Sequence, residues 1–238
     1  MAFSRCPFGE KVTPAMKRGF FRRLAPWVDH LAIQKMDLGW FHDPKYIMSV
    51  ELNDVTPICQ PPMRVTPDVE QWLKEWALGQ EEVGLVQRAG PYEELPVVTA
   101  LLTVPGQQHG QKYRVVQNLV PLNKRTKVLH YPMTDVAKVK LALGRAAFLS
   151  KIDLKAGFFN VPLAEDSQKY TAFSCAAGRF YWKRMTMGMC NAPAHFQWVM
   201  EDIMAGEGDE AQLPVAVLLD DVTVAEDDLQ GNMDGASS

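Results

Sequence analysis

The sequence PVAVLLDDVTVA at residues 214–225 decides the fold expected of this chain. Two short β-branched runs flank its central LLDD, and such runs around a polar turn are typical of paired strands. We therefore predict a tight hairpin with the carboxylates of Asp220 and Asp221 at its tip. Adjacent carboxylates repel each other, and a divalent cation with oxygen ligands would offset that repulsion. An exposed acidic turn is the alternative, because Asp-Asp pairs are common and another follows at residues 227–228.

Three upstream blocks of sequence favour the metal-binding interpretation of the Asp pair over the exposed acidic turn. The sequence FLSKIDLKAGF at residues 148–158 predicts a strand over 147–153 that ends at Asp153, followed by a turn with glycine. The other two blocks are MTMGMCNAPAHFQ at residues 185–197 and KYRVVQNLVPLNK at residues 112–124.

These four blocks, in this order, resemble the reverse transcriptase of LTR retrotransposons, closest to the gypsy type. The resemblance covers roughly residues 46–229 and includes PICQPP at 57–62, YP at 131–132 and KYTAF at 169–173. It implies an α+β fold with reverse-transcriptase-like fingers and palm. The palm would be a split βαβ (ferredoxin-like) antiparallel sheet with helices on one face.

The resemblance also implies a division of the chain. Residues 1–45 would be an N-terminal extension of unknown role, residues 46–130 a fingers-like region, residues 131–229 a palm with the catalytic carboxylates, and residues 230–238 a frayed tail. We expect the chain to stop before the thumb. The RNase H and integrase domains of such polyproteins would also lie outside it.

The carboxylates take their role from the resemblance. Asp153 and Asp220 would bind two Mg²⁺ ions, or Mn²⁺ as a substitute, with Asp221 as the accessory carboxylate. One ion would lower the pKa of the primer 3′-hydroxyl, and the other would stabilise the leaving pyrophosphate. Positioning and charge neutralisation carry such a reaction.

Five further residues would bind the nucleotide. Arg114 matches the fingers arginine that contacts the triphosphate, and a planar guanidinium suits phosphate oxygens. Lys112 is the nearest residue to the family's second fingers lysine, and Phe158 stands where an aromatic excludes a ribose 2′-hydroxyl. Gly188 would let the backbone approach the nucleotide, beside Met187. A surface arginine and a core aromatic are the plain alternatives for Arg114 and Phe158.

The chain departs from the family at several positions. Leu218 replaces an aromatic before the Asp pair, and Thr186 and Met187 replace the usual Pro and Phe or Gln. Asn118 and Val120 stand where Asp and Arg are common. These changes leave the carboxylates intact and bear on nucleotide affinity, fidelity and activity.

Composition narrows the class of protein. At 238 residues the chain can bury one substantial core or two small ones. The four cysteines have no CxxC spacing, which argues against zinc and gives no disulfide framework. No apolar run approaches the ~18 residues of a membrane span, and residues 1–30 lack the apolar segment of a secretory signal. We expect an intracellular protein, cytoplasmic or nuclear and not secreted, with no membrane partner.

The net charge of −3 hides an asymmetry. Residues 111–184 carry a formal excess of ten positive charges, whereas residues 185–238 carry eleven acidic residues and no Lys or Arg. Lys and Arg that neutralise phosphates supply most non-specific affinity for nucleic acid. The alternative is a solvated basic face with an acidic tail.

Other patterns predict the remaining elements. Thr66-Pro67 would cap a helix whose face carries Trp72 and Trp76, as core rather than as a base-stacking platform. Strands are expected at 96–104 and 112–119 as a hairpin, and at 170–175 and 179–184. Helices are expected after Tyr131-Pro132 and over 193–204.

The predicted function is an RNA-directed DNA polymerase, a nucleotidyltransferase that acts on an RNA or DNA template with primer and on deoxynucleoside triphosphates. The alternative is an inactive retroelement remnant that acts as a nucleic-acid-binding or interaction module. A structural Ca²⁺- or Mg²⁺-binding domain is a third reading. The acidic tail lacks the residue spacing of a calcium loop, which argues against it.

Overall fold

The structure is a computed structural model that describes residues 9, 12–24, 38–106, 112–132, 144, 148–154, 156–205, 215–218 and 221–226. The chain divides into two compact units. The first, here the carboxylate unit, comprises Met1–Gly39, Pro132–Lys155 and Gln197–Ser238. The second, here the five-strand unit, comprises Trp40–Tyr131 and Ala156–Phe196.

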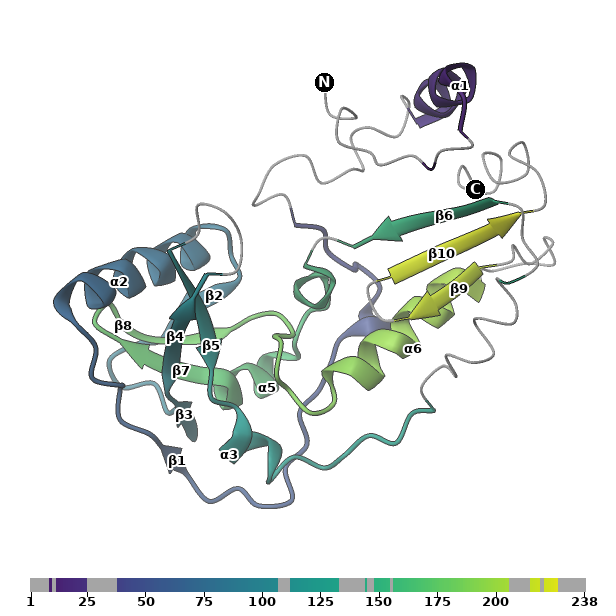
Figure 1. The fold of residues 1–238 in the computed structure, drawn as a ribbon. Coiled ribbons are helices and arrows are strands. Elements are labelled where there is room, and N and C mark those ends of the chain that lie inside the picture. The colour runs from purple at the N-terminus through teal and green to yellow at the C-terminus, as the bar shows by residue number, and fades with distance from the viewer. Residues whose placement is uncertain are drawn as a thin grey trace. The chain divides into compact units, whose positions relative to one another are not determined.

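The five-strand unit is built on a sheet with strand order β1-β3-β7-β8-β2 (Figure 1). The strands are β1 (Ile58–Cys59), β2 (Val86–Arg88), β3 (Val97–Thr99), β7 (Ala172–Cys175) and β8 (Gly178–Trp182). The β1–β3 and β3–β7 pairs are parallel, and the β7–β8 and β8–β2 pairs are antiparallel. Segments from both parts of the unit's sequence therefore share one sheet.

Helix α2 (Pro67–Glu82) packs against this sheet. Proline in the first turn favours its start, as predicted, and Leu73 and Ala77 are buried. The Trp76 ring lies 6.0 Å from Phe173 and 6.1 Å from Trp182, so the aromatic stripe belongs to the core as predicted. Thr66 is the N-cap residue, as predicted, but its hydroxyl donates to the Asp68 carboxylate instead of accepting a backbone N–H.

The strand expected at 96–104 is broken at Ala100. Its first part, β3, joins the large sheet, and its second part, β4 (Leu101–Pro105), forms an antiparallel hairpin with β5 (Tyr113–Gln117). The Ala100 N–H donates to Gln60 Oε1 at 3.0 Å instead of continuing a ladder. A side chain forty residues away thus ends one strand and starts the next.

Gln117 fastens this hairpin to the large sheet. Its Nε2 donates to Thr99 Oγ1 at 2.8 Å and to the Thr171 carbonyl at 2.9 Å. Its Oε1 accepts from Trp182 Nε1 at 2.7 Å. One amide therefore connects β5 with β3, β8 and the turn before β7.

The carboxylate unit contains an antiparallel sheet with the order β6-β10-β9. These strands are β6 (Phe148–Asp153), β9 (Val215–Leu218) and β10 (Asp221–Glu226). The predicted strand at 147–153 and the terminal hairpin are thus confirmed. On β10, Val222 and Val224 are buried while Asp221 and Thr223 are partly exposed, which is the alternation of a one-sided sheet.

The strands β7 and β8, expected at 170–175 and 179–184, lie outside the carboxylate sheet, whereas the split βαβ palm implied by the resemblance would place them in one sheet with β6 and the terminal hairpin. The reason is burial. Phe173 and Phe180 are both fully buried, and they stack on each other at 5.8 Å within the sheet that α2 covers. Strands with such apolar side chains are stable only where a second layer packs on them.

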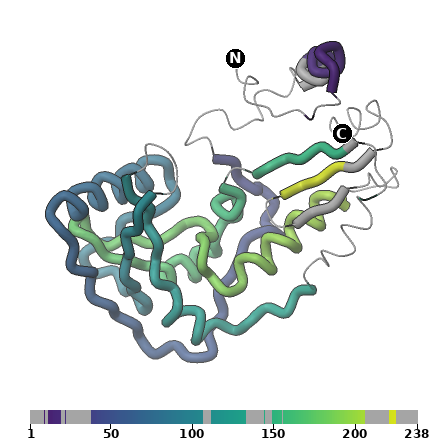
Figure 2. Tube along the Cα trace, in the orientation of Figure 1, coloured from purple at the N-terminus to yellow at the C-terminus, as the bar shows by residue number. Residues whose placement is uncertain are grey.

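The remaining elements are helices that lie outside the sheets, and Figure 2 shows the course of the chain through them. They are α1 (Pro14–Leu24), η2 (Pro44–Tyr46), α3 (Val120–Asn123), η3 (Gly157–Asn160), α5 (Glu165–Gln168), η4 (Lys169–Thr171) and α6 (Ala192–Ala205). Helix α6 confirms the helix expected at 193–204. The helix expected after Tyr131-Pro132 lies outside the described residues. Among the described helices, none is both long and apolar enough to cross a membrane.

Candidate active site

Two of the three predicted carboxylates face each other across a strand pair. Asp153 is the last residue of β6 and Asp221 the first of β10, and the register pairs them directly. Opposed residues of an antiparallel pair have Cα atoms roughly 4.5–5.5 Å apart and side chains on one face. Asp153 is exposed and Asp221 partly exposed. Asp220 lies outside the described residues.

A lysine on the same face contacts this pair. Lys151 stands opposite Thr223, one step of the period-two alternation from the carboxylates. Its Nζ lies 2.8 Å from Asp221 Oδ2. The side chains of Lys151 and Asp221 are 59% and 39% exposed. The pair is therefore solvated and can rearrange.

The chemistry of the pair fits a hard divalent cation. Carboxylate oxygens are the protein ligands that Mg²⁺ prefers, and Mg²⁺ commonly uses one or two of them and keeps its waters. Asp153 and Asp221 offer two such groups in register at accessible strand ends. Within the described residues no cluster of three or more His, Cys, Asp or Glu side chains forms. The described part of the site therefore offers two carboxylates, Asp153 and Asp221, to a cation.

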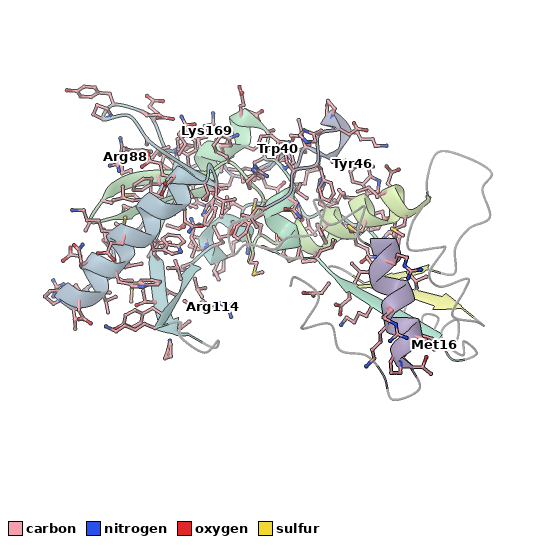
Figure 3. The ribbon with its side chains drawn as sticks, turned by 90° about the horizontal axis from the view of Figure 1, so that it is seen from above. Met16, Trp40, Tyr46, Arg88, Arg114 and Lys169 are labelled. Atoms are coloured by element: carbon pink, nitrogen blue, oxygen red, sulfur yellow. The ribbon has the colours of Figure 1, made fainter. Side chains whose placement is uncertain are left out.

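The predicted nucleotide-binding residues all belong to the five-strand unit, and two of them line one pocket. Arg114 on β5 and Met187 border a pocket of about 330 Å³. Arg114, which is labelled in Figure 3, is exposed, and the Met187 side chain is 51% exposed. The pocket is also lined by Trp76, Gln80, Val115, Val116, Gln117, Phe159, Trp182 and Thr186.

Aromatic rings form part of the wall of this pocket. Phe159 and Trp182 stack with centroids 5.2 Å apart and planes 12° apart. The Trp182 indole N–H is held by Gln117. A guanidinium beside a flat apolar wall suits a ligand that has both an anionic and a planar part.

Lys112 is engaged elsewhere. Its Nζ lies 3.4 Å from Asp68 Oδ2, and the Tyr113 hydroxyl donates to the same oxygen at 3.3 Å. The negative charge that ionised Tyr113 would carry, and the hydrogen bond to Asp68, raise the pKa of Lys112. Lys112 therefore pairs with Asp68 in the N-terminal turn of α2 as a solvated cation, and it is absent from the lining of the Arg114 pocket.

Phe158 is positioned by an aromatic contact. Its ring lies 5.1 Å from that of Phe196, which is fully buried. Phe196 also closes on Gly157, where an added Cβ would lie 2.7 Å from the ring. Phe196 thus acts in packing, and it fixes the turn that carries Phe158. Phe158 itself is partly buried. This burial is compatible with both predicted roles, exclusion of a ribose 2′-hydroxyl and packing in the core.

Gly188 has a conformation that glycine alone adopts readily, with φ of +92°. Its carbonyl accepts from Asn123 Nδ2 at 2.7 Å, and Asn123 Oδ1 accepts from the Cys190 N–H at 3.0 Å. The Asn123 amide therefore holds the 188–190 turn. No role was predicted for Asn123 from the sequence, although it lies in the block at residues 112–124.

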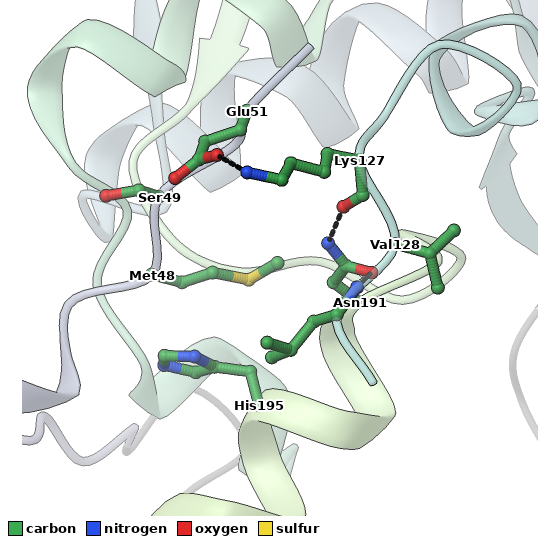
Figure 4. A pocket seen from close by; sticks show the side chains of 8 residues that line it. Met48, Ser49, Glu51, Lys127, Val128, Asn191 and His195 are labelled. Carbon is green, nitrogen blue, oxygen red and sulfur yellow. Dashed lines mark hydrogen bonds and ion pairs between the residues drawn. The ribbon is translucent and has the colours of Figure 1, made fainter. Parts of the chain in front are cut away.

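A second pocket, of about 280 Å³, was also missed (Figure 4). Glu51 and Lys127 form an ion pair at 3.0 Å on its wall, and Asn191 Nδ2 donates to the Lys127 carbonyl at 2.8 Å. His195 lines it as well, with Nε2 2.9 Å from the Tyr46 carbonyl. Burial lowers the pKa of His195, against the opposing effect of that carbonyl. The histidine is therefore neutral at neutral pH.

The fold and the carboxylate pair define a class of protein. The structure of a foamy viral protease-reverse transcriptase in complex with RNA/DNA hybrid matches with a TM-score of 0.80 and 18% identity, covering 95% of this chain and 29% of that one. The fold is that of a reverse transcriptase, and the predicted fold class is confirmed. A family model described as reverse transcriptase (RNA-dependent DNA polymerase) matches residues 107–234. The chain belongs to this family.

Relatives support the same conclusion. A putative enzymatic polyprotein of Cassava vein mosaic virus is 28% identical over 228 residues, which cover 93% of this chain and 32% of that protein. The retrovirus-related Pol polyprotein from transposon gypsy of Drosophila melanogaster is 33% identical over 91 residues, 38% of this chain and 9% of that protein. The family resemblance is confirmed. The chain spans a third or less of each of these polyproteins.

Proposed function

We propose that this chain is the fingers and palm of an RNA-directed DNA polymerase, which adds deoxynucleotides to a primer 3′-hydroxyl by two-metal-ion transfer. The observation that carries the proposal is the register of β6 and β10, which opposes Asp153 and Asp221 on one accessible face. Its partners would be an RNA or DNA template with primer, deoxynucleoside triphosphates, and the further domains of a retroelement polyprotein. In this proposal residues 46–130 would be fingers and residues 131–229 palm, a division along the sequence that crosses the structural one, because Ala156–Phe196 belong to the same unit as Trp40–Tyr131.

In this proposal Asp153, Asp220 and Asp221 hold two Mg²⁺ ions, for which Mn²⁺ can substitute. When bound, the ions lower the pKa of the attacking hydroxyl and neutralise charge on the leaving pyrophosphate. The protein contributes rigid placement, because the ladder of β6 and β10 fixes the backbone behind Asp153 and Asp221.

The nucleotide would be held by the five-strand unit. Arg114 would bind triphosphate oxygens with two N–H groups at once, beside the stacked rings of its pocket. Phe158, braced by Phe196, would exclude a ribose 2′-hydroxyl. The backbone at Gly188, held by Asn123, would approach the nucleotide. Lys112 would contact the nucleotide only after its ion pair with Asp68 has broken.

We place this reaction inside the cell, cytoplasmic or nuclear. Cys59, Cys175 and Cys190 are free thiols, as a reducing compartment favours.

Primer extension tests the proposal. The purified chain receives a DNA primer annealed to an RNA template, with Mg²⁺ and deoxynucleoside triphosphates. The Asp153→Asn, Asp220→Asn and Asp221→Asn variants are compared with Asp166→Asn, which changes an exposed carboxylate in the five-strand unit. We expect extension by the parent and by the control, and none by the Asp153→Asn or Asp220→Asn variants.

The alternative function predicts a different result. An inactive remnant would bind the primer–template without extending it, and the variants would bind like the parent. Extension that survives Asp153→Asn would contradict the two-metal mechanism.

A further inference from the structure

The geometry points to Lys151 as an internal counter-ion of the metal site. In the metal-free protein the Lys151 ammonium pairs with the Asp221 carboxylate. A divalent cation must therefore compete with Lys151 for that carboxylate. This inference rests on the proposed function, because it assumes that Asp153 and Asp221 hold the metal. It assigns a positioning role to a residue outside the three carboxylates.

The first argument is placement. Antiparallel register sets Lys151 opposite Thr223 and Asp153 opposite Asp221, so all four side chains leave the same face of the sheet. Residues that lie diagonally across a strand pair are within reach of a long side chain. The observed separation of 2.8 Å between Lys151 Nζ and Asp221 Oδ2 shows that the lysine uses this reach.

The second argument is charge. Asp153 and Asp221 bring two negative charges to adjacent strand ends, and such like charges directly opposite each other are destabilising. The Lys151 ammonium reduces the net charge of this group from −2 to −1. The β6–β10 pairing is thereby stabilised before any metal arrives.

The third argument is competition for the same oxygen. A metal ion that binds Asp221 gains less from a carboxylate that already accepts a charge-assisted hydrogen bond. The Lys151 side chain is 59% exposed, so water can solvate the ammonium once it is displaced. The need to displace Lys151 from Asp221 therefore weakens metal binding without preventing it. The magnitude of an exposed ion pair implies a change of roughly two- to fivefold in the metal dissociation constant.

Direct metal binding tests this role without catalysis. Mn²⁺ is titrated into the full chain without nucleic acid or nucleotide, and free Mn²⁺ is followed by electron paramagnetic resonance. We expect Lys151→Met to bind Mn²⁺ roughly two- to fivefold more tightly than the parent. Lys151→Arg, which keeps the cation, should stay within about twofold of the parent. Lys151→Gln provides a second neutral variant if Lys151→Met fails to fold.

A matched control separates local from general charge effects. Lys45 is also ion-paired and half-exposed, with Nζ 3.6 Å from Asp43 Oδ2 in the other unit. Lys45→Met should leave the dissociation constant unchanged. Melting without metal gives a second readout. Lys151→Met should melt at a lower temperature than the parent, and Mn²⁺ should restore more of its stability than it adds to the parent.

The outcomes distinguish the inference from the function beneath it. If Asp153→Asn binds Mn²⁺ as the parent does, the metal site itself is wrong and the inference falls with it. If Asp153→Asn weakens binding but both neutral Lys151 variants bind equally or more weakly than the parent, the counter-ion role alone is overturned.

Discussion

Arg114 is the residue whose proposed role depends most on side-chain geometry. A lysine at this position would keep the charge and lose the planar pair of N–H donors. We expect Arg114→Lys to raise the KM for deoxynucleoside triphosphates about tenfold or more, because a charge-assisted hydrogen bond contributes about 1.5–3 kcal/mol. Steady-state primer extension measures this.

The matched control for that prediction is Arg64→Lys, which alters an exposed arginine outside the pocket lining. Its KM should equal that of the parent. An unchanged KM for Arg114→Lys would show that Arg114 acts as a general surface charge.

His195 predicts a pH dependence of stability at the same scale. Burial lowers its pKa in the folded state below the ordinary value of 6.5, so the unfolded chain binds more protons as the pH falls. The contribution to stability is therefore full above about pH 6.5 and is lost below it, until the lowered folded-state pKa is reached. One proton gives a slope of at most about 1.4 kcal/mol per pH unit.

Urea unfolding at about pH 7.5 and about pH 5.5 measures this slope. We expect His195→Gln to lose less stability on acidification than the parent, since glutamine does not titrate. His130→Gln, at an exposed histidine, is the matched control variant. Equal slopes in the parent and His195→Gln would contradict the assignment.

At the scale of elements, Gln117 carries the attachment of the β4–β5 hairpin. Replacing it with leucine keeps much of the volume but leaves Trp182 Nε1 and the Thr171 carbonyl without this partner. We expect Gln117→Leu to lower the free energy of unfolding by about 2–4 kcal/mol, because each buried unpaired group costs about 1–3 kcal/mol.

Gln87→Leu is the matched control, because Gln87 is exposed on the edge strand β2. Its effect should stay within about 0.5 kcal/mol. Urea denaturation of the parent and the two variants measures the free energy of unfolding. If Gln117→Leu leaves that free energy unchanged, the hairpin is held by its apolar contacts instead.

The elements also show what the sequence could and could not predict. The helix from Pro67, the strand ending at Asp153 and the terminal hairpin follow from local patterns, because a first-turn proline and hydrophobic periodicity depend on neighbouring residues only. The break at Ala100 depends on Gln60, a partner distant in sequence. Periodicity carries no information about such contacts.

The candidate site, like the fold, could be predicted from the sequence only in part. The family blocks predicted Asp153 and Asp221, and the structure brings these two together. The contact of Lys151 with Asp221 required the register of β6 on β10, which the spacing of the motifs does not give. The pairing of Lys112 with Asp68 was likewise hidden, since it joins residues 44 positions apart.

At the scale of the whole molecule, charge is distributed unevenly along the chain. Residues 111–184 hold an excess of ten positive charges although the chain carries −3 overall. We expect the logarithm of the affinity for primer–template to fall linearly with the logarithm of the salt concentration. Neutralising about three phosphates implies a loss of roughly 40-fold between about 50 and about 200 mM salt.

Fluorescence anisotropy with a labelled duplex measures this slope. An uncharged peptide nucleic acid duplex of the same sequence is the control, since it carries no condensed counterions. An affinity for the ordinary duplex that is independent of salt would contradict a phosphate-binding face.

The pocket beside Arg114 has an optical consequence. Trp76 and Trp182 both line it, and the Trp182 indole is stacked on Phe159 and hydrogen-bonded to Gln117. Indole emission responds to nearby charge and to solvent, so a triphosphate that enters this pocket would change the colour and intensity of the light that the protein itself emits. Under the proposed function the chain would thus contain its own reporter of nucleotide occupancy, and substitution of Trp182 would remove part of that signal without any added dye.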